Sequence, residues 1–326
     1  GLNSARIGPL EHLTYISSHA MGALSFEPCV ADMQTSENIP LQQLAQEVQE
    51  VLKGEGGEFL QHLLVKGGSP QGARPKALVY RDPVNLEFST QDSDQHEAWL
   101  IKFPAQQEHP EVCAIEAVYA ECLRLCAIET PDTHFFNLPN GLTAFASKRF
   151  DRQNGMRIPM QSLAAYTGAD YKVPGSLDYR NFLRATLMCT QDVRERLHAF
   201  KRAVFNVLFN NRDDHTKNFS FLMEKNGQWK LAPAYDVTFC EGPGGYHQMD
   251  IMGEALNISR NDIHKLGTSE ANLTTLEVDE IILTMREIAL QFSQIAQRLY
   301  PHQIRESTLQ MIQSRIQQNI DFLTET

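Results

Sequence analysis

A hairpin pattern between Asn218 and Asp236 constrains this chain more than any other feature of its sequence. Two short apolar and aromatic runs, 219–223 and 229–232, are separated by Asn226-Gly227. An Asn-Gly pair readily supplies the positive φ angles of a tight turn, so the two runs read as paired strands. Such a hairpin returns Asp236 to the side of Asn218. Two oxygen donors then converge on one hard cation, which suits Mg²⁺.

Asp213 stands five residues before Asn218, which is the spacing of a kinase catalytic loop. In such a loop the aspartate orients the hydroxyl of the nucleophile and the asparagine binds a magnesium ion. Taken alone, this segment also reads as an Asp/Asn-rich loop whose side chains start turns. The hairpin favours a site because it gives the ligands a reason to meet. His215, beside Asp213, either contacts phosphate and orders the loop or is a structurally satisfied histidine.

A glycine-rich segment at 67–76 is the candidate for holding a nucleotide. Its three glycines let backbone amides approach phosphate closely, and Arg74 and Lys76 add positive charge. The segment does not match the Walker pattern, and a mobile connection is the alternative. A strand expected at 77–81 follows it directly.

A second expected strand, at 98–103, carries Lys102, a candidate for binding nucleotide phosphates. Glu116 lies on the next expected helix, 110–126, and would hold the Lys102 ammonium in place. The alternative for both residues is a solvated surface charge.

Five motifs occur together in one order along the chain. They are Gly68-Ser69 through Gly72-Ala73-Arg74-Pro75-Lys76-Ala77-Leu78, Leu100-Ile101-Lys102-Phe103-Pro104, Lys148-Arg149-Phe150-Asp151-Arg152, Asp213 through Asn218-Phe219-Ser220, and Pro233-Ala234-Tyr235-Asp236. In this order the motifs resemble HipA-type serine/threonine kinases, the toxins of bacterial HipBA toxin-antitoxin systems. The resemblance implies an α+β, two-lobed protein-kinase-like fold that uses ATP and Mg²⁺.

The resemblance also assigns roles by position. It implies Asp213 as the catalytic aspartate, Asn218 and Asp236 as the metal ligands, and Lys102 as the phosphate-binding lysine. Further implied nucleotide contacts are Ser69, Gly72, Lys76, Lys148, Phe150, Asp151 and His215. The segment 148–150 would link the lobes and bind adenine, and Asp151 would contact ribose or the neighbouring lobe. Arg149 is expected to be a structural ion-pair partner.

Ser69 resembles the family's loop serine, whose self-phosphorylation ejects the loop and inactivates the kinase. A phosphoserine adds nearly two negative charges where ATP phosphates sit, so the loop would be repelled from the pocket. The alternative is a serine that only stabilises a turn. Ser69-Pro70 departs from the family pattern, because proline fixes φ and removes a donor.

The resemblance implies partners as well. They are a protein substrate, with an aminoacyl-tRNA synthetase as the expected one, and a helix-turn-helix antitoxin through which DNA is contacted only indirectly. The family's first small N-terminal subdomain is expected to be missing here. It would reside on a separate small protein, as in split three-component systems, or would have been removed by engineering.

Composition fits an enzyme that acts away from membranes. The chain has 326 residues, of which 42% are hydrophobic, and a formal net charge of −11, which argues against nonspecific nucleic-acid binding as its main activity. No apolar run approaches the roughly 18 residues of a membrane span, and no signal peptide appears at the start. The six cysteines show no metal-site spacing. We therefore expect a cytoplasmic protein without a membrane partner.

A mixed strand and helix lobe is expected to end near Arg152, where Gln153-Asn154-Gly155 starts the connection to a helical lobe. We expect a nucleotide-binding lobe at 1–152 and a helical catalytic lobe at 153–326, with helices at 178–189, 192–210, 278–300 and 304–323. Two other functions stay open from the residues. One is a small-molecule phosphotransferase, and the other is a catalytically inactive nucleotide-binding partner of a DNA-binding protein.

Overall fold

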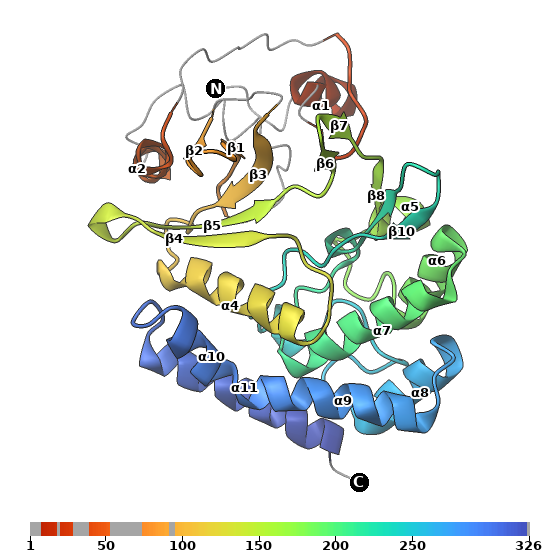
Figure 1. The fold of residues 1–326 in the computed structure, drawn as a ribbon. Coiled ribbons are helices and arrows are strands. Elements are labelled where there is room, and N and C mark those ends of the chain that lie inside the picture. Colours follow the sequence, from red (N-terminus) through yellow and green to blue (C-terminus); the bar gives the residue numbers. More distant parts are fainter. Residues whose placement is uncertain (1–7, 18–19, 29–38, 53–73, 91–94, 325–326) are drawn as a thin grey trace. The chain divides into compact units, whose positions relative to one another are not determined.

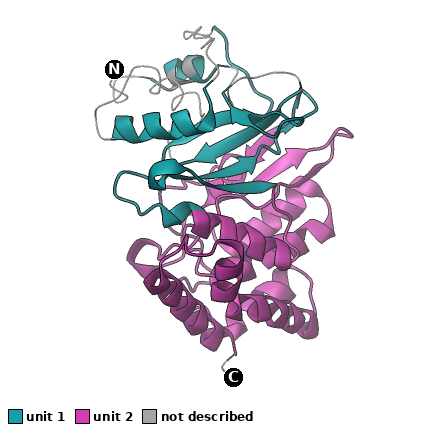
Figure 2. Ribbon diagram, turned by 60° about the vertical axis from the view of Figure 1, so that its left-hand side comes forward, with its two compact units in different colours: residues 1–113, 132–159 teal, residues 114–131, 160–326 magenta. Residues whose placement is uncertain are grey.

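The computed structural model describes residues 8–17, 20–28, 39–52, 74–90 and 95–324, and every structural statement below concerns these residues (Figure 1). The chain divides into two compact units, 1–113 with 132–159 and 114–131 with 160–326 (Figure 2). The lobe boundary expected after Arg152 stays a prediction.

The first unit is built on a five-stranded antiparallel sheet in the order β2-β1-β3-β5-β4. A short two-stranded ribbon, β6-β7, follows it. The elements of this unit are α1 (Pro9–Ile16), α2 (Leu41–Leu52), β1 (Lys76–Arg81), β2 (Phe88–Ser89), β3 (Glu97–Lys102), β4 (Thr133–Asn137), η3 (Pro139–Gly141), β5 (Thr143–Lys148), β6 (Arg152–Gln153) and β7 (Met156–Arg157).

Alternate residues of the central strands form the core of this unit. Ala77 and Val79 of β1 are fully buried, and Ile101 of β3 is buried with them. Side chains of a strand alternate between the two faces of a sheet, so these positions share one face. Leu44 and Val48 of α2 join the same cluster, four residues apart as one face of a helix requires. The helix and strands therefore bury one another's apolar faces.

The second unit is mainly helical and carries a three-stranded antiparallel sheet in the order β10-β9-β8. Its elements are α4 (Glu111–Leu125, which belongs to this unit from Ala114 on), β8 (Met160–Ser162), α5 (Leu163–Thr167), α6 (Tyr179–Thr190), α7 (Val193–Leu208), η4 (Thr216–Asn218), β9 (Ser220–Met223), β10 (Trp229–Leu231), η5 (Pro243–Gly245), α8 (Arg260–Glu270), α9 (Thr275–Leu290), α10 (Phe292–Leu299) and α11 (Glu306–Thr324).

Aromatic packing fixes the helices of the second unit. Tyr119 of α4 is fully buried and its ring contacts Phe205, Phe209 and Phe292 edge-on. Its hydroxyl donates a hydrogen bond to the carbonyl of Phe209 at 2.5 Å, which satisfies the one polar atom of the side chain. Three helices are thereby packed together at the C-terminal end of α7, just before the segment that carries Asp213 and Asn218.

The helix expected at 278–300 is wrong in its extent, because the structure has two helices there, α9 and α10, separated at Gln291. Phe292 is fully buried at the start of α10, and the backbone amide of Ser293 donates to Oε1 of Gln313 on α11 at 3.1 Å. These tertiary contacts end one helix and begin the next. No helix among the described residues is long and apolar enough to span a membrane.

Candidate active site

The hairpin β9–β10 forms as expected, with Trp229 opposite Met223 and Leu231 opposite Phe221. Its turn differs from the prediction, since only Gly227 has a positive φ, of 82°. The backbone amide of Glu224 still donates to the carbonyl of Gln228 at 2.8 Å, which leaves a three-residue loop. Such loops place one residue in the left-handed region, and glycine adopts that conformation without strain.

Tyr235 anchors the end of the hairpin to the catalytic-loop segment. Its hydroxyl donates to the carbonyl of Lys217 at 2.7 Å and lies 2.6 Å from the hydroxyl of Ser220. These two partners flank the pair Asn218-Phe219 in the chain, so the hairpin returns the residue before Asp236 to the loop that carries Asn218. Asp236 itself has a φ of 56°, a left-handed conformation that is uncommon outside glycine and that concentrates at functional sites.

Asn218 closes the loop onto Asp213. Its side-chain amide nitrogen donates to the backbone carbonyl of Asp213 at 2.7 Å. Because the nitrogen is engaged, the amide oxygen is the atom that Asn218 offers to a cation. The side chain is buried, at 9% exposure, and ends the short turn η4.

The Asp213 carboxylate is half exposed, with 47% of its side chain accessible. Gln248 donates to Asp213 Oδ1 at 2.9 Å through its Nε2, and His215 Nε2 lies 3.8 Å from the same oxygen. Burial raises the pKa of Asp213, and the carboxylates of Asp236 and Asp214 raise it further, whereas His215 and Gln248 act in the opposite direction. The carboxylate therefore has both the access and the raised basicity that a general base requires.

Asp214, the next residue, is fully buried in a hydrogen-bond network. Its Oδ2 accepts a bond from the Tyr179 hydroxyl at 2.7 Å and lies 2.8 Å from His247 Nδ1. Its Oδ1 accepts a bond from the backbone amide of Gln248 at 2.8 Å. Burial, and then the charge of Asp214, raise the pKa of Tyr179 well above its usual value, so this tyrosine is a neutral donor.

The network continues away from the carboxylate through two asparagines. Asn206 donates to the Tyr179 hydroxyl at 2.9 Å, and Asn211 donates to Asn206 at 2.9 Å. Sequence reasoning assigned no role to these residues, to Gln248 or to His247. The contacts between 247–248 and 213–214 join residues more than 30 positions apart, and no local pattern announces them.

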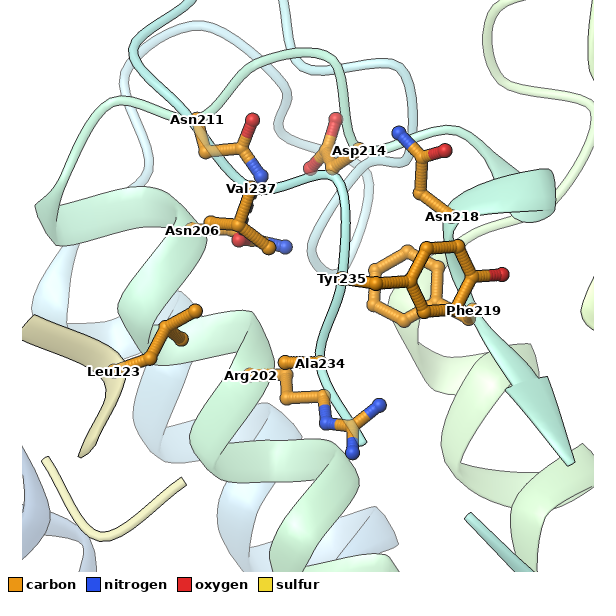
Figure 3. A pocket seen from close by; sticks show the side chains of 10 residues that line it. All are labelled: Leu123, Arg202, Asn206, Asn211, Asp214, Asn218, Phe219, Ala234, Tyr235 and Val237. Carbon is orange, nitrogen blue, oxygen red and sulfur yellow. Dashed lines mark hydrogen bonds between the residues drawn. The ribbon is translucent and has the colours of Figure 1, made fainter. Parts of the chain in front are cut away.

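A pocket lies directly behind this loop (Figure 3). Figure 3 shows Asn211, Asp214 and Asn218 along one end of the pocket. Oδ1 of Asn211 is buried without a hydrogen-bond partner. The lining residues are Leu123, Arg202, Asn206, Asn211, Asp214, Asn218, Phe219, Ala234, Tyr235 and Val237.

The oxygen ligands that the loop offers suit a hard divalent cation. Among the described residues no group of three or more His, Cys, Asp or Glu side chains could hold a metal ion. Asn218 and Asp236 offer an amide oxygen and a carboxylate instead. A short set of oxygen donors completed by phosphates and water is the arrangement that Mg²⁺ prefers in phosphoryl-transfer sites.

In the first unit, two of the candidate lysines face each other across neighbouring strands. Lys76 is the first residue of β1 and pairs with Lys102 of β3 in the antiparallel register. Lys76 was expected on a loop, but the structure places it on the strand. Lys102 is buried, at 6% exposure, and its Nζ lies 5.9 Å from the centre of the Phe145 ring. Two cations on one patch of sheet suit an anionic ligand.

The segment 148–150, expected to bind adenine, uses part of its backbone inside the unit. The amides of Lys148 and Arg149 donate to the carbonyls of Asp132 and Ala98 at 2.8 and 2.9 Å. The Lys148 ammonium donates to Glu97. Neither of these amides is thus directed at a ligand in this structure, and the adenine contact stays a prediction. Phe150 is half buried.

Asp151 lies at the centre of a buried ion cluster. Its carboxylate accepts bonds from Arg149 at 2.7 Å, from Arg152 at 2.9 Å and from the amide of Gly22 at 2.7 Å. Arg152 also donates to the carbonyl of Ala20 at 2.9 Å. Burial alone would raise the pKa of Asp151, but the hydrogen bonds and charges of these arginines lower it overall. These contacts favour a structural role for Asp151 in holding the segment 20–22, and its expected ribose contact stays a prediction.

Three other site residues expected from the sequence, Ser69, Gly72 and Glu116, remain predictions. Ser69 and Gly72 lie outside the described residues. Glu116 is buried on α4 in the second unit, at 3% exposure, whereas Lys102 belongs to the first. Their pairing would join the two units and stays a prediction.

Comparison with known proteins gives the family. The model of the HipA-like C-terminal domain matches residues 68–298. A Haemophilus influenzae protein whose name designates it a kinase, without a stated substrate, is 23% identical over 193 residues, covering 52% of this chain and 52% of that protein. The chain thus spans about half the length of this curated relative.

Among solved structures, HipA from a Shewanella oneidensis complex with HipB and operator DNA matches 93% of this chain and 76% of its own, at 16% identity and a TM-score of 0.71. The Helicobacter pylori proinflammatory kinase CtkA matches 70% of this chain and 88% of its own, at 14% identity and a TM-score of 0.47. The first of these confirms the expected two-lobed α+β fold. The family resemblance drawn from the five motifs is confirmed too, and the chain belongs to the family of HipA-like C-terminal domains.

Proposed function

We propose that this protein is an ATP- and Mg²⁺-dependent serine/threonine protein kinase that acts as the toxin of a bacterial toxin-antitoxin system. The observation that carries the proposal is the return of the hairpin onto the catalytic loop through the Tyr235 hydroxyl and the Lys217 carbonyl. That return brings Tyr235, the residue before Asp236, to the loop that carries Asn218. Asp213, Asn218 and Asp236 stand in the order and spacing that phosphoryl transfer requires.

Each residue has a proposed role in transfer. Asp213 accepts a hydrogen bond from the hydroxyl of the acceptor and takes its proton as the new O–P bond forms, while the bond between the γ-phosphorus and the bridging oxygen breaks and ADP leaves. Lys102, with Lys76 opposite it on the sheet, binds nucleotide phosphates. Asn218 and Asp236 would hold Mg²⁺, which when bound neutralises charge on the phosphates. The rate enhancement rests on positioning and electrostatics, because phosphoryl transfer needs little covalent help from the protein.

The lobes proposed for these roles are 1–152 for the nucleotide and 153–326 for catalysis. Within the first, the proposed nucleotide contacts also include Ser69, Gly72, Lys148, Phe150 and Asp151, with His215 from the second. Glu116 is proposed to orient Lys102, and Arg149 to pair with Asp151.

The proposed partners follow from the family. A helix-turn-helix antitoxin is supported by the Shewanella oneidensis HipA structure, which contains HipB and operator DNA. DNA would be reached through that antitoxin, which fits the formal net charge of −11 on this chain. An aminoacyl-tRNA synthetase is the proposed substrate, and a small protein carrying the family's first subdomain is a proposed partner. With these partners, the proposed site of action is the cytoplasm.

Incubation of the purified protein with γ-labelled ATP, Mg²⁺ and a bacterial lysate tests the proposal. Label on serine or threonine of protein supports it. Label only on small molecules favours a small-molecule phosphotransferase. Absence of any transfer, together with measurable ATP binding, favours an inactive nucleotide-binding regulator and contradicts the proposal.

A further inference from the structure

Gln248 is bonded to both consecutive carboxylates of the catalytic loop. Its side-chain Nε2 donates to Asp213 Oδ1 at 2.9 Å, and its backbone amide donates to Asp214 Oδ1 at 2.8 Å. Among the described residues it is the side chain that donates a hydrogen bond to the Asp213 carboxylate within 3.0 Å. His215, the next polar neighbour, lies 3.8 Å away, beyond a hydrogen bond.

The backbone on either side of this side chain is fixed independently of it. The carbonyl of Gln248 accepts a bond from the amide of Gly175 at 2.8 Å, and the amide of His247 donates to the carbonyl of Ala255 at 2.8 Å. The side chains of His247 and Met249 are buried, at 3% and 1% exposure. The Gln248 amide group is therefore presented to Asp213 from a preorganised main chain.

We propose that Gln248 is a positioning residue for phosphoryl transfer: it holds Oδ1 of Asp213 so that Oδ2 faces the hydroxyl of the acceptor. This inference rests on the proposed kinase function. A carboxylate joined to its Cα by two rotatable bonds samples several orientations when half exposed. One fixed hydrogen-bond donor to Oδ1 favours one of these orientations. A larger fraction of enzyme–substrate complexes then has the near-attack geometry that transfer requires.

The proposal predicts that removing the Gln248 side chain affects kcat more than the KM for ATP. The described hydrogen bonds of Gln248 go to the catalytic loop and to Gly175, and none goes to the lysines proposed to bind phosphates. Gln248→Ala should therefore lower kcat about tenfold while the KM for ATP changes less than about twofold. The backbone bonds of residue 248 persist in this variant, so it should fold.

Two further variants separate donation from shape. Gln248→Glu keeps the size of the side chain but replaces the donor by a carboxylate that repels Asp213. Gln248→Lys changes the shape but keeps a donor within reach. The proposal predicts that the lysine variant retains more kcat than the glutamate variant. A purely structural role for Gln248 predicts the reverse order, and that order would overturn the proposal.

Gln313 supplies the matched control. It is a half-buried glutamine on α11 whose side chain bonds Ala289 and Ser293, each at 3.1 Å. Gln313→Ala removes a side-chain amide that makes hydrogen bonds comparable to those of Gln248 but lies outside the proposed site. This variant should leave kcat unchanged.

A spectroscopic measurement tests the hydrogen bond between Gln248 and Asp213 independently of kinase activity. In the side-chain amide region of a ¹⁵N spectrum of the full chain, Asp213→Ala should move the Gln248 resonances and leave those of Gln313 in place. If the wild-type protein transfers no phosphate, the proposed function fails and the role of Gln248 fails with it, even when the resonances move. If it transfers phosphate but the Gln248 resonances and the kcat of Gln248→Ala are unchanged, the positioning role alone is overturned.

Discussion

Asp213 and Asp214 are adjacent in the chain and have opposite surroundings. The side chain of Asp213 is 47% exposed, whereas that of Asp214 is fully buried and bonded to Tyr179, His247 and the backbone of Gln248. Buried partners therefore hold the Asp214 carboxylate, whereas the more exposed Asp213 carboxylate accepts a hydrogen bond from Gln248 Nε2 at 2.9 Å. The Asp214 carboxylate is part of the loop's buried hydrogen-bond network, and the Asp213 carboxylate remains accessible to a ligand.

The buried carboxylate should therefore matter for stability. Asp214→Asn replaces one carboxylate oxygen by an NH₂ group, which cannot accept the hydrogen bonds that the neighbouring groups donate. We expect this change to lower the free energy of unfolding by about 2–3 kcal/mol. Asp170→Asn, on an exposed loop, is the control and should have an effect below about 0.5 kcal/mol. Urea denaturation followed by circular dichroism measures both. Equal midpoints for Asp214→Asn and wild type would contradict this account of the network.

Lys102→Ala should weaken nucleotide use more than Lys76→Ala. Both lysines lie on paired strands, but Lys102 is buried at 6% exposure, whereas Lys76 is only half buried. A side chain held by its surroundings loses less freedom when it binds phosphate, so its removal costs more affinity. The KM for ATP of each variant is the measurement. A larger effect at Lys76 would require the phosphate site to be redrawn around β1.

Ser69 lies outside the described residues, and its regulatory role is a prediction from the family resemblance. Phosphorylation there should add charge that opposes the nucleotide phosphates and lowers the affinity for ATP. Mass spectrometry after incubation with ATP should find phosphate on Ser69, and the modified fraction should bind ATP more weakly. An active kinase with Ser69 unmodified would remove the switch and leave the catalytic assignment intact.

Asp151 should stabilise the fold in a pH-dependent way. Its carboxylate is paired with Arg149 and Arg152, and its pKa is lowered in the folded state. The stabilisation is therefore present above the unfolded pKa of about 3.9 and is lost as the pH falls through the lower folded-state pKa. Asp151→Asn should cost about 3 kcal/mol at pH 7, because the buried Arg149 and the half-buried Arg152 lose their charged partner.

The melting temperatures of wild type and Asp151→Asn should converge as the pH falls below about 4. Glu121→Gln, which removes a surface carboxylate that pairs with Arg124 at 3.2 Å, serves as the control. It should change stability by less than about 1 kcal/mol. A destabilisation by Asp151→Asn that does not vary with pH would show that the effect comes from packing rather than charge.

The sequence predicts those parts of the fold that local patterns determine. The β9–β10 hairpin follows from Asn226-Gly227 between two apolar runs, and α6 and α7 begin after Asp178 and Asp192, whose side chains cap them. The break at Gln291 is not predictable in this way. No proline or glycine marks it, and the contacts of Phe292 and Ser293 that produce it are tertiary.

In the candidate site too, local patterns predict some residues, whereas others depend on tertiary contacts. Asp213, Asn218 and Asp236 are proposed from their spacing, because a hairpin joins them over a short stretch of chain, and their roles stay predictions. Gln248 and His247 are missed because their contacts with Asp213 and Asp214 depend on a long connection whose path only the folded chain reveals. Consecutive aspartates were the one available hint, since two charges side by side need different surroundings.

The most direct test of the central claim is transfer of labelled phosphate from γ-labelled ATP by wild type, Asp213→Asn and Asp236→Asn. Asp321→Asn, an exposed residue of α11, is the matched control. We expect wild type and the control to transfer label and both site variants to lose at least about 100-fold in rate, while circular dichroism shows them folded. Burial and neighbouring carboxylates raise the pKa of Asp213, so its neutral replacement should not weaken the fold. Wild-type transfer by either folded site variant would contradict the assignment of this loop as the centre of phosphoryl transfer.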